Sequence, residues 1–248
     1  MERSVIPMSW EEFEVMEQPF GWKVEYGDGQ ANLTPRAIGV TTRLRLAPRN
    51  FSHTHQLIPA HPGYCEQMIA GYFETFADSV EFCSWPTADI EASAEKDIQR
   101  FFSGTKGEPL SASVIALAPD AQQLIGVALF LLKPPEQTPY MDLLYVRPEF
   151  QHQGIATAML GWGIDRLLAA GFQTLDSAYH ICNEPSQRWH HRYGFEDVTD
   201  WYYARLKVGW YRSEIARRKK LGLTEGLDVL RQECDHWATQ VDPEDLVG

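Results

Sequence analysis

The segment with the clearest chemical signal is "QHQGIATAML", residues 151–160, where the apolar run "YMDLLYV" gives way to an apparent helix. A helix that begins directly after a turn presents unpaired backbone N–H groups and the positive end of its dipole, and both favour an anion. Gly154 has no Cβ where a phosphate would come closest, and Ala156 is small. We therefore predict a phosphate-binding turn. An ordinary strand-to-helix turn is the alternative, because the stretch is neither GxxxxGK[ST] nor GxGxxG.

Three titratable side chains in the flanking segments could move a proton. Asp142 lies in the apolar run, and the two-residue period of a strand places it on the same face as Leu144 and Val146. It could be a base, an anchor for a cationic amine, or a surface carboxylate. His190 and Tyr193 lie three residues apart in "NEPSQRWHHRYGF", so a helix makes them neighbours. Either could protonate a leaving group, or His190 could simply be a polar residue of a short helix.

Two motifs in this order resemble the GCN5-related N-acetyltransferase (GNAT) family. The family signature Q/R-x-x-G-x-G/A, which follows the fourth strand, is matched by Gln151, Gly154 and Ala156. The second hallmark is an asparagine after the next strand, then a small residue, a tyrosine and Gly-Phe. Here His190 stands where the tyrosine is usual, and the matching residues are Asn183, Ser186, Gly194 and Phe195. The resemblance covers residues 110–205.

This resemblance implies direct transfer of an acetyl group from acetyl-CoA to an amine, with no metal. It implies that the backbone of Leu144, Tyr145 and Val146 meets the pantetheine arm. The pyrophosphate would bind at the turn formed by His152, Gln153, Gly154, Ile155, Ala156 and Thr157, and Gln151 would also belong to the cofactor-binding residues. Asn183 and Ser186 would contact the cofactor arm or shape its strand, and His190, Asp142 and Tyr193 would be the catalytic residues. The alternative is a non-catalytic acyl-CoA-binding module that serves regulation or partner docking.

The elements that must position these residues alternate between strand and helix patterns over residues 54–207. A hairpin signal at residues 111–133 and inserted helices predict an α+β domain. By the resemblance, its sheet is GNAT-like, mixed and mostly antiparallel, with helices on its flanks. "VTDWYYARLKV", residues 198–208, is predicted to be its last strand.

Residues 1–50 and 208–248 lie outside this domain. Ser9 and Glu12 form a predicted capping box, and Gly27 to Gly29 a predicted hairpin turn, which together indicate a helix-and-hairpin appendage. The C-terminal extension is predicted to be helical, with an apolar seam of Leu227, Leu230, Cys234, Trp237 and Val241. We favour packing of this seam on the chain itself. Packing on a second copy would instead make the protein a homodimer.

Composition limits the class of protein. The 248 residues carry a formal net charge of -12, which argues against nucleic acid as a partner, because binding phosphate chains requires a basic surface. The longest apolar run, residues 124–132, is too short to span a membrane, which needs about 20 residues. Four cysteines without a CxxC pair, and no signal-peptide pattern, predict a cytoplasmic protein. His53 and His55 lack a third ligand, so no metal site is predicted.

Overall fold

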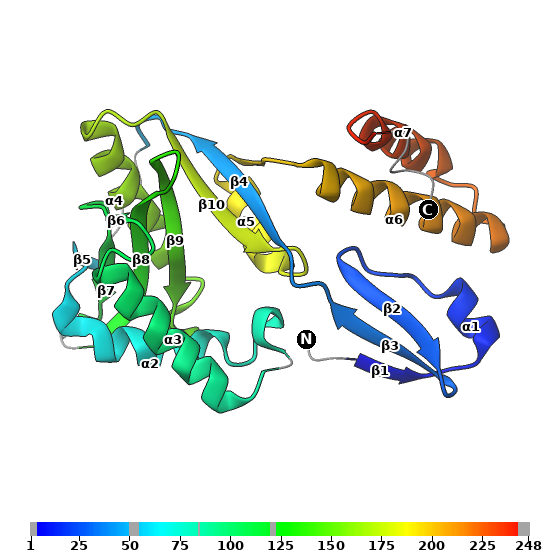
Figure 1. The fold of residues 1–248 in the computed structure, drawn as a ribbon, viewed down its shortest axis with the longest axis horizontal. Helices are drawn as coiled ribbons and strands as arrows, with labels where there is room; N and C mark the ends of the chain where they lie inside the picture. Colours follow the sequence, from blue (N-terminus) through cyan, green and yellow to red (C-terminus); the bar gives the residue numbers. More distant parts are fainter. Residues whose placement is uncertain (1–3, 50–54, 84, 120–122, 243–248) are drawn as a thin grey trace. The chain divides into compact units, whose positions relative to one another are not determined.

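The computed structural model describes residues 4–49, 55–83, 85–119 and 123–242, and the chain forms two compact units (Figure 1). The first unit combines residues 1–40, 179–188 and 197–248, and the second combines residues 41–178 and 189–196. Each unit therefore joins segments that are distant in the sequence. The predicted linear division into residues 1–50, 54–207 and 208–248 stays a prediction.

The sheet that runs through the second unit is mixed and mostly antiparallel, as predicted. Its strands lie in the order β11-β4-β10-β9-β8-β7-β5, with β6 also paired to β8. Only β10 and β9 are parallel among the neighbours whose register the described residues give. The strand bounds are Gly39–Arg45 (β4), Gln56–Pro59 (β5), Glu108–Pro109 (β6), Val114–Leu117 (β7), Leu124–Lys133 (β8), Thr138–Val146 (β9), Thr174–His180 (β10) and Phe195–Asp197 (β11).

Helices cover both faces of this sheet, which explains the continuous apolar run of β8. Side chains of a strand alternate between faces, so Leu129 packs with the helices α2 and α3, whereas Phe130 packs with α4. Both residues are almost fully buried. The helices are α2 (Cys65–Phe76), α3 (Thr87–Phe102), α4 (Ile155–Ala169) and α5 (Glu184–Arg192), with 3-10 turns at Pro62–Tyr64, Val80–Phe82 and Pro148–Phe150.

The N-terminal part of the first unit has the helix and hairpin that the sequence predicts. The helix α1 (Trp10–Val15) begins with a complete capping box, in which Ser9 and Glu12 exchange hydrogen bonds. The strands β2 (Trp22–Gly27) and β3 (Gln30–Pro35) form the hairpin, and β1 (Ser4–Pro7) pairs with the other edge of β3. Asp28 and Gly29 at the turn both have positive φ, as a tight hairpin requires.

The predicted last strand was wrong, because residues 201–208 begin a long helix. Only Phe195–Asp197 pairs in the sheet, and α6 runs from Trp201 to Lys220. The side chain of Asp200 accepts a hydrogen bond from the backbone N–H of Tyr203 at 2.8 Å and so caps the helix. This cap and the burial of Tyr203 and Val208 outweigh the β propensity of "WYY".

The C-terminal seam packs on the chain itself. The helix α7 (Leu227–Ala238) places Cys234 against Ala204 and Val208 of α6, and Trp237 borders the same cluster. The prediction of a helical C-terminal extension is therefore confirmed for the described residues.

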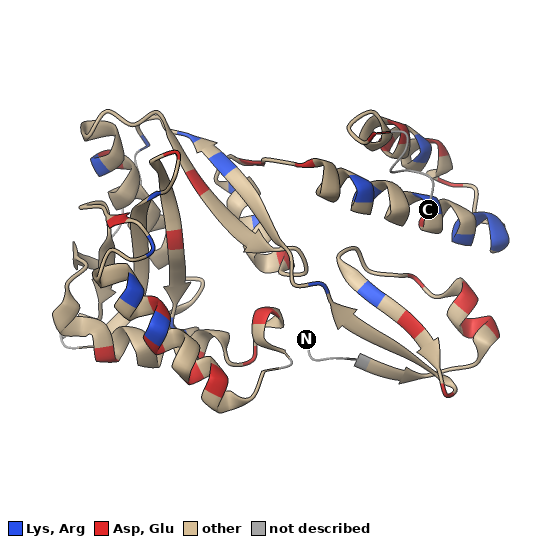
Figure 2. Ribbon diagram, in the orientation of Figure 1, with Lys and Arg blue, Asp and Glu red and all other residues tan. Residues whose placement is uncertain are grey.

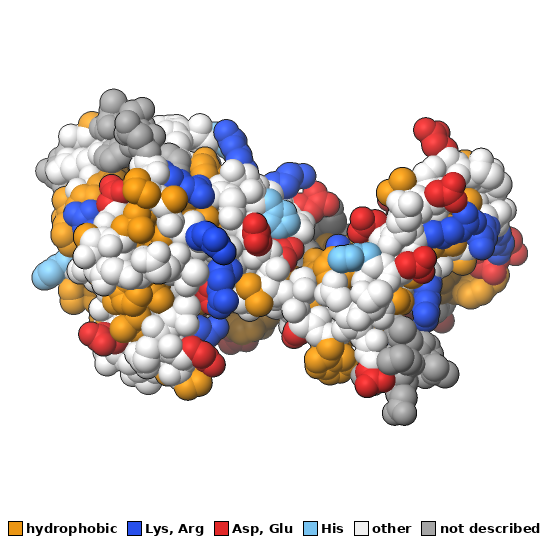
Figure 3. All heavy atoms as spheres, turned by 90° about the horizontal axis from the view of Figure 1, so that it is seen from above, with side chains coloured by type: hydrophobic (Ala, Val, Ile, Leu, Met, Phe, Trp, Pro, Cys, Tyr) orange, Lys and Arg blue, Asp and Glu red, His pale blue; other side chains and the backbone are white. Residues whose placement is uncertain are grey.

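Among residues 4–49, 55–83, 85–119 and 123–242, no helix is long and apolar enough to cross a bilayer. The face shown in Figure 3 carries acidic and basic side chains interspersed with hydrophobic ones. The four cysteines form no disulfide with one another.

The close approach of α4 to β8 generates a test of the packing that positions the candidate site. A Cβ on Gly163 would lie 2.6 Å from Cζ of the buried Phe130. Gly163→Ala should therefore lower the free energy of unfolding by about 1–3 kcal/mol through overpacking, although alanine favours helices. Gly209→Ala in α6 is the control, because its Cβ would meet nothing within 4 Å. Denaturant unfolding should show Gly209→Ala stabilised by up to about 1 kcal/mol. Equal stabilisation of both variants would contradict the packing.

Candidate active site

The turn between β9 and α4 leaves backbone donors free. His152 and Gly154 have φ of 62° and 79°, and Gly154 is the N-cap of α4. The first bond of the helix runs from Ala158 N–H to the Gly154 carbonyl at 3.0 Å. The N–H groups of Ile155, Ala156 and Thr157 have no acceptor among the described residues. Three donors thus point out of the helix start.

The space and charge around this turn suit an anion. A Cβ on Gly154 would meet nothing within 4 Å, so the backbone is open on that side. The first turn of α4 has no acidic residue and no side-chain cap that would compete for the donors. The predicted phosphate-binding turn therefore has both the donors and the room that a phosphate needs.

Polar side chains on the turn brace it. Gln151 donates from Nε2 to the carbonyl of Val146 at 3.1 Å, which ties the turn to the end of β9. His55 contacts the carbonyl of Gln153 at 2.9 Å, and since a carbonyl only accepts, its Nε2 carries the proton. His152 is exposed. Gln151 thus has a structural contact in addition to its predicted role at the cofactor.

The strands β9 and β10 leave part of β9 open beside the turn. They run parallel and pair at Tyr140 and Asp176. Leu144, Tyr145 and Val146 stay paired with β8 on their other side. Their β10 side has no strand partner among the described residues, so this edge of β9 can accept an extended chain.

A β-bulge corrects the predicted orientation of Asp142. The register between β8 and β9 pairs Leu129 with Leu143 but Phe130 with Met141, so Asp142 is an extra residue. Such a residue breaks the two-residue alternation of the strand. Leu144 packs on the α4 side of the sheet, with Met141. The carboxylate of Asp142 instead meets a residue that follows α3, so the expectation that it shares a face with Leu144 and Val146 was wrong.

That residue is Lys106, which sequence reasoning missed. Its Nζ lies 2.6 Å from Oδ2 of Asp142 and 3.6 Å from Oδ1 of Asp97. Lys106 lies in a turn-rich segment after α3, and no local pattern connects it with a strand so far along the chain. Asp142 is therefore already ion-paired, which suits an anchor for ammonium groups better than a free base.

His190 is held inside the protein. It is 4% exposed, and its ring meets Trp189 and Phe195 edge-on. Its Nε2 lies 3.1 Å from Oγ of Ser177, which in turn donates to the carbonyl of Met141 at 3.3 Å. Because the serine proton is engaged there, Ser177 accepts from His190, and Nε2 carries a proton. His190 thereby links α5 to the point where β9 and β10 separate.

Tyr193 lies next to the phosphate-binding turn. Its hydroxyl is 2.5 Å from Oγ1 of Thr157, which belongs to the first turn of α4. The structure thus brings together Tyr193, Thr157 and the free N–H groups of the turn.

Asn183 and Ser186 stand at the start of α5, in the first unit. Oδ1 of Asn183 accepts from the backbone N–H of Ser186 at 3.0 Å, and its carbonyl accepts from the N–H of Gln187. Asn183 therefore caps this helix. The contact of Asn183 and Ser186 with the cofactor stays a prediction.

The family comparison decides the assignment of this arrangement. The model of the acetyltransferase (GNAT) family matches residues 75–195. These residues are a GNAT acetyltransferase domain. The match includes β9, the turn, α4 and α5, so the sequence resemblance is confirmed, and it supports N-acetyltransferase activity for the domain.

Other comparisons are more distant. No curated protein matches the chain. PaiA N-acetyltransferase from Thermoplasma acidophilum, in complex with coenzyme A, is 18% identical with a TM-score of 0.47, over 58% of this chain and 91% of that one. AAC(6')-Iy, in complex with a bisubstrate analogue, is 18% identical with a TM-score of 0.42, over 60% and 94%. A GNAT protein from Sphaerobacter thermophilus is 14% identical with a TM-score of 0.43, over 64% and 48%. With such scores these likenesses add nothing to the assignment.

Metal ligands are not grouped in the GNAT domain or elsewhere in the described part of the chain. No three His, Cys, Asp or Glu side chains there form a group that could hold a metal ion. His53 lies outside the described residues.

The end of β9 is anchored by an ion pair that generates a pH prediction. Arg147 donates from Nε and Nη2 to Glu74 at 2.7 and 2.6 Å, and these hydrogen bonds hold the pKa of Glu74 below its ordinary value. A lowered pKa stabilises the fold above the unfolded pKa, near 4.3, and this contribution is lost as the pH falls.

The difference in unfolding free energy between wild type and Glu74→Gln should therefore shrink between about pH 7 and about pH 3. Glu91→Gln, at an exposed position of α3, is the control and should show no such trend. A pH-independent difference for Glu74→Gln would contradict the ion pair.

Proposed function

We propose that this chain is an acetyl-CoA-dependent N-acetyltransferase that transfers the acetyl group directly to an amine. The observation that carries the proposal is the coincidence of the family match with three free N–H groups at Gly154, where the family signature lies. A cytoplasmic location and a homodimer stay predictions from the sequence.

The binding role of the turn follows from its donors. Acetyl-CoA supplies a pyrophosphate, an extended pantetheine arm and a reactive thioester. The N–H groups of Ile155, Ala156 and Thr157 would donate to the pyrophosphate oxygens, aided by the helix dipole. The open edge of β9 at Leu144 and Val146 would pair with the amides of the arm.

The transfer needs one proton removed and one supplied. A neutral amine attacks the carbonyl carbon of the thioester, a C–N bond forms, and the C–S bond breaks. The amine loses a proton to water, and the departing sulfur takes one from an acid. A backbone N–H on the open edge of β9 would polarise the carbonyl.

We assign the acid role to Tyr193 and a positioning role to His190. The hydroxyl of Tyr193 lies at the first turn of α4, where the cofactor would bind. His190 is buried and its Nε2 proton is engaged by Ser177. We assign Asp142 to holding a cationic group of the acceptor other than the neutral amine that attacks, because its carboxylate already holds an ammonium group. The family match does not support the non-catalytic alternative.

The first test concerns the phosphate-binding turn. Gly154→Val should weaken CoA binding at least about tenfold in calorimetry, because the side chain would occupy the open space beside the donors. Gly171→Val is the matched control, since Gly171 lies at the other end of α4 with φ of 87° and nothing within 4 Å of its Cβ. Both variants should lose about 1–2 kcal/mol of stability from left-handed backbone strain. Equal CoA affinity in the two variants would refute the turn as the site.

The second test concerns the proton donor. Tyr193→Phe should lower kcat by about 10² to 10⁴ with little change in the KM for acetyl-CoA. His190→Gln keeps a donor toward Ser177 and should retain most of kcat, whereas His190→Phe should lower kcat without altering the shape of the pH profile.

Full activity in Tyr193→Phe together with collapse in His190→Gln would move the acid to His190. Full activity in both would leave water as the donor. An absence of CoA release with any amine, despite CoA binding, would instead favour a non-catalytic acyl-CoA-binding module.

A further inference from the structure

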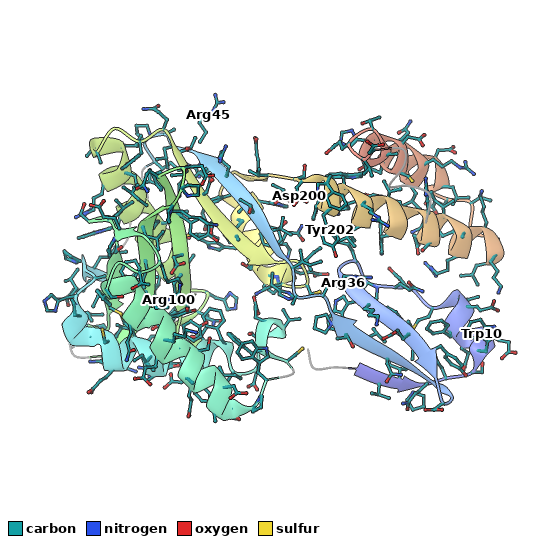
Figure 4. All side chains as sticks on the ribbon, in the orientation of Figure 1. Trp10, Arg36, Arg45, Arg100, Asp200 and Tyr202 are labelled. Carbon is teal, nitrogen blue, oxygen red and sulfur yellow. The ribbon has the colours of Figure 1, made fainter. Side chains whose placement is uncertain are left out.

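Two carboxylates share one ammonium group on the α2 and α3 side of β9. Lys106 lies 2.6 Å from Asp142 and 3.6 Å from Asp97, and the three side chains are 19%, 13% and 36% exposed. Arg100, labelled on α3 in Figure 4, is exposed and makes no ion pair with Asp97. The group of Asp97, Asp142 and Lys106 therefore has a net charge of one negative unit, and Asp97 is incompletely neutralised.

The hydroxyl of the buried Tyr72 lies within electrostatic reach of the same two carboxylates. Tyr72 of α2 is 7% exposed, and its hydroxyl has no hydrogen-bond partner among the described residues. Burial raises its pKa, and the negative charges of Asp97, Glu81 and Asp142 raise it further. Tyr72 thus keeps its proton, and its oxygen can accept a hydrogen bond from a cation.

Aromatic rings continue from Tyr72 to the surface. The ring centroids of Tyr72 and Phe82 are 6.2 Å apart, and those of Phe82 and Trp85 are 5.2 Å apart. Trp85 is 50% exposed. Carboxylates beside aromatic faces form a favourable environment for a substituted ammonium group, because both attract positive charge.

This group borders the part of β9 that the proposed transfer uses. Asp142 is the bulged residue of β9, and the open edge of this strand begins two residues later, at Leu144. Figure 2 shows acidic positions on β9 and β10 within a sheet whose strands carry few charges. Arg43 already holds the carboxylate of Asp176 on β10, with hydrogen bonds of 2.6 and 2.7 Å. Of these two acidic residues, Asp142 on β9 is therefore the one that can meet a cationic ligand.

We propose that Asp97, Asp142 and Tyr72 bind a second ammonium group of the acceptor, which is therefore a diamine or polyamine. The inference rests on the proposed acetyltransferase function. Lys106 shows that an ammonium group fits between the two carboxylates, and the residual negative charge allows one more to bind beside it. The amine that reacts is the other end of the acceptor, and it must be neutral when it attacks.

The test compares the diamine putrescine with the monoamine butylamine, which has the same carbon chain but one ammonium group. Calorimetry in the presence of CoA measures amine binding without any turnover. Putrescine should bind wild-type protein at least about tenfold more tightly, as expected for one partly buried ion pair. With acetyl-CoA, kcat/KM should favour putrescine by a similar factor.

Asp97→Asn and Tyr72→Phe should each reduce this preference several-fold, and Asp97→Asn, at a partly exposed position, should fold normally. Glu91→Gln is the control on the same helix and should keep the preference. Equal binding of the two amines by wild type, or an unchanged preference in Asp97→Asn, would overturn the proposal. Failure of the function itself would appear differently, as CoA that does not bind or is not released by either amine.

Discussion

The left-handed backbone at Gly154 is the constraint on which the rest of the site depends. A positive φ lets the chain turn sharply from β9 into α4 without side-chain capping, so three N–H groups stay free at the helix start. Gly163 lets the same helix approach Phe130 of β8 closely, which fixes the direction in which those donors point. The helix that would bind the cofactor is thus positioned by glycines at its start and in its middle.

The sheet separates two kinds of chemistry. On the α4 side, free backbone donors suit the phosphates of a nucleotide. On the α2 and α3 side, Asp97 and Asp142 suit a cation, and they share Lys106. The open edge of β9 lies between them, and the bulge at Asp142 is what turns a carboxylate toward the second side. A thioester bound along β9 would therefore have its phosphates and its amine acceptor on different sides of the sheet.

Local signals predicted much of this arrangement from the sequence. The glycine in "QHQGIATA" marked the start of α4, and the capping box marked α1. The apolar periods gave the strands and helices from β5 to α5 in their order, apart from the short β6, but they did not indicate β4 or β11. The face of Asp142 was missed because "YMDLLYV" reads the same with or without a bulge. The helix α6 was missed because its cap, Asp200, precedes a strongly β-prone "WYY". Lys106 was missed because its partner is brought to it only by the fold.

The most direct measurement of the central claim is an NMR titration of ¹⁵N-labelled protein with CoA. If the pyrophosphate binds at the start of α4, the backbone amides of Ile155, Ala156 and Thr157 should shift strongly downfield as they gain charged acceptors, and the amide of Gly171 at the far end of the helix should not move. Saturation of the protein with CoA while these three amides keep their positions would contradict the account.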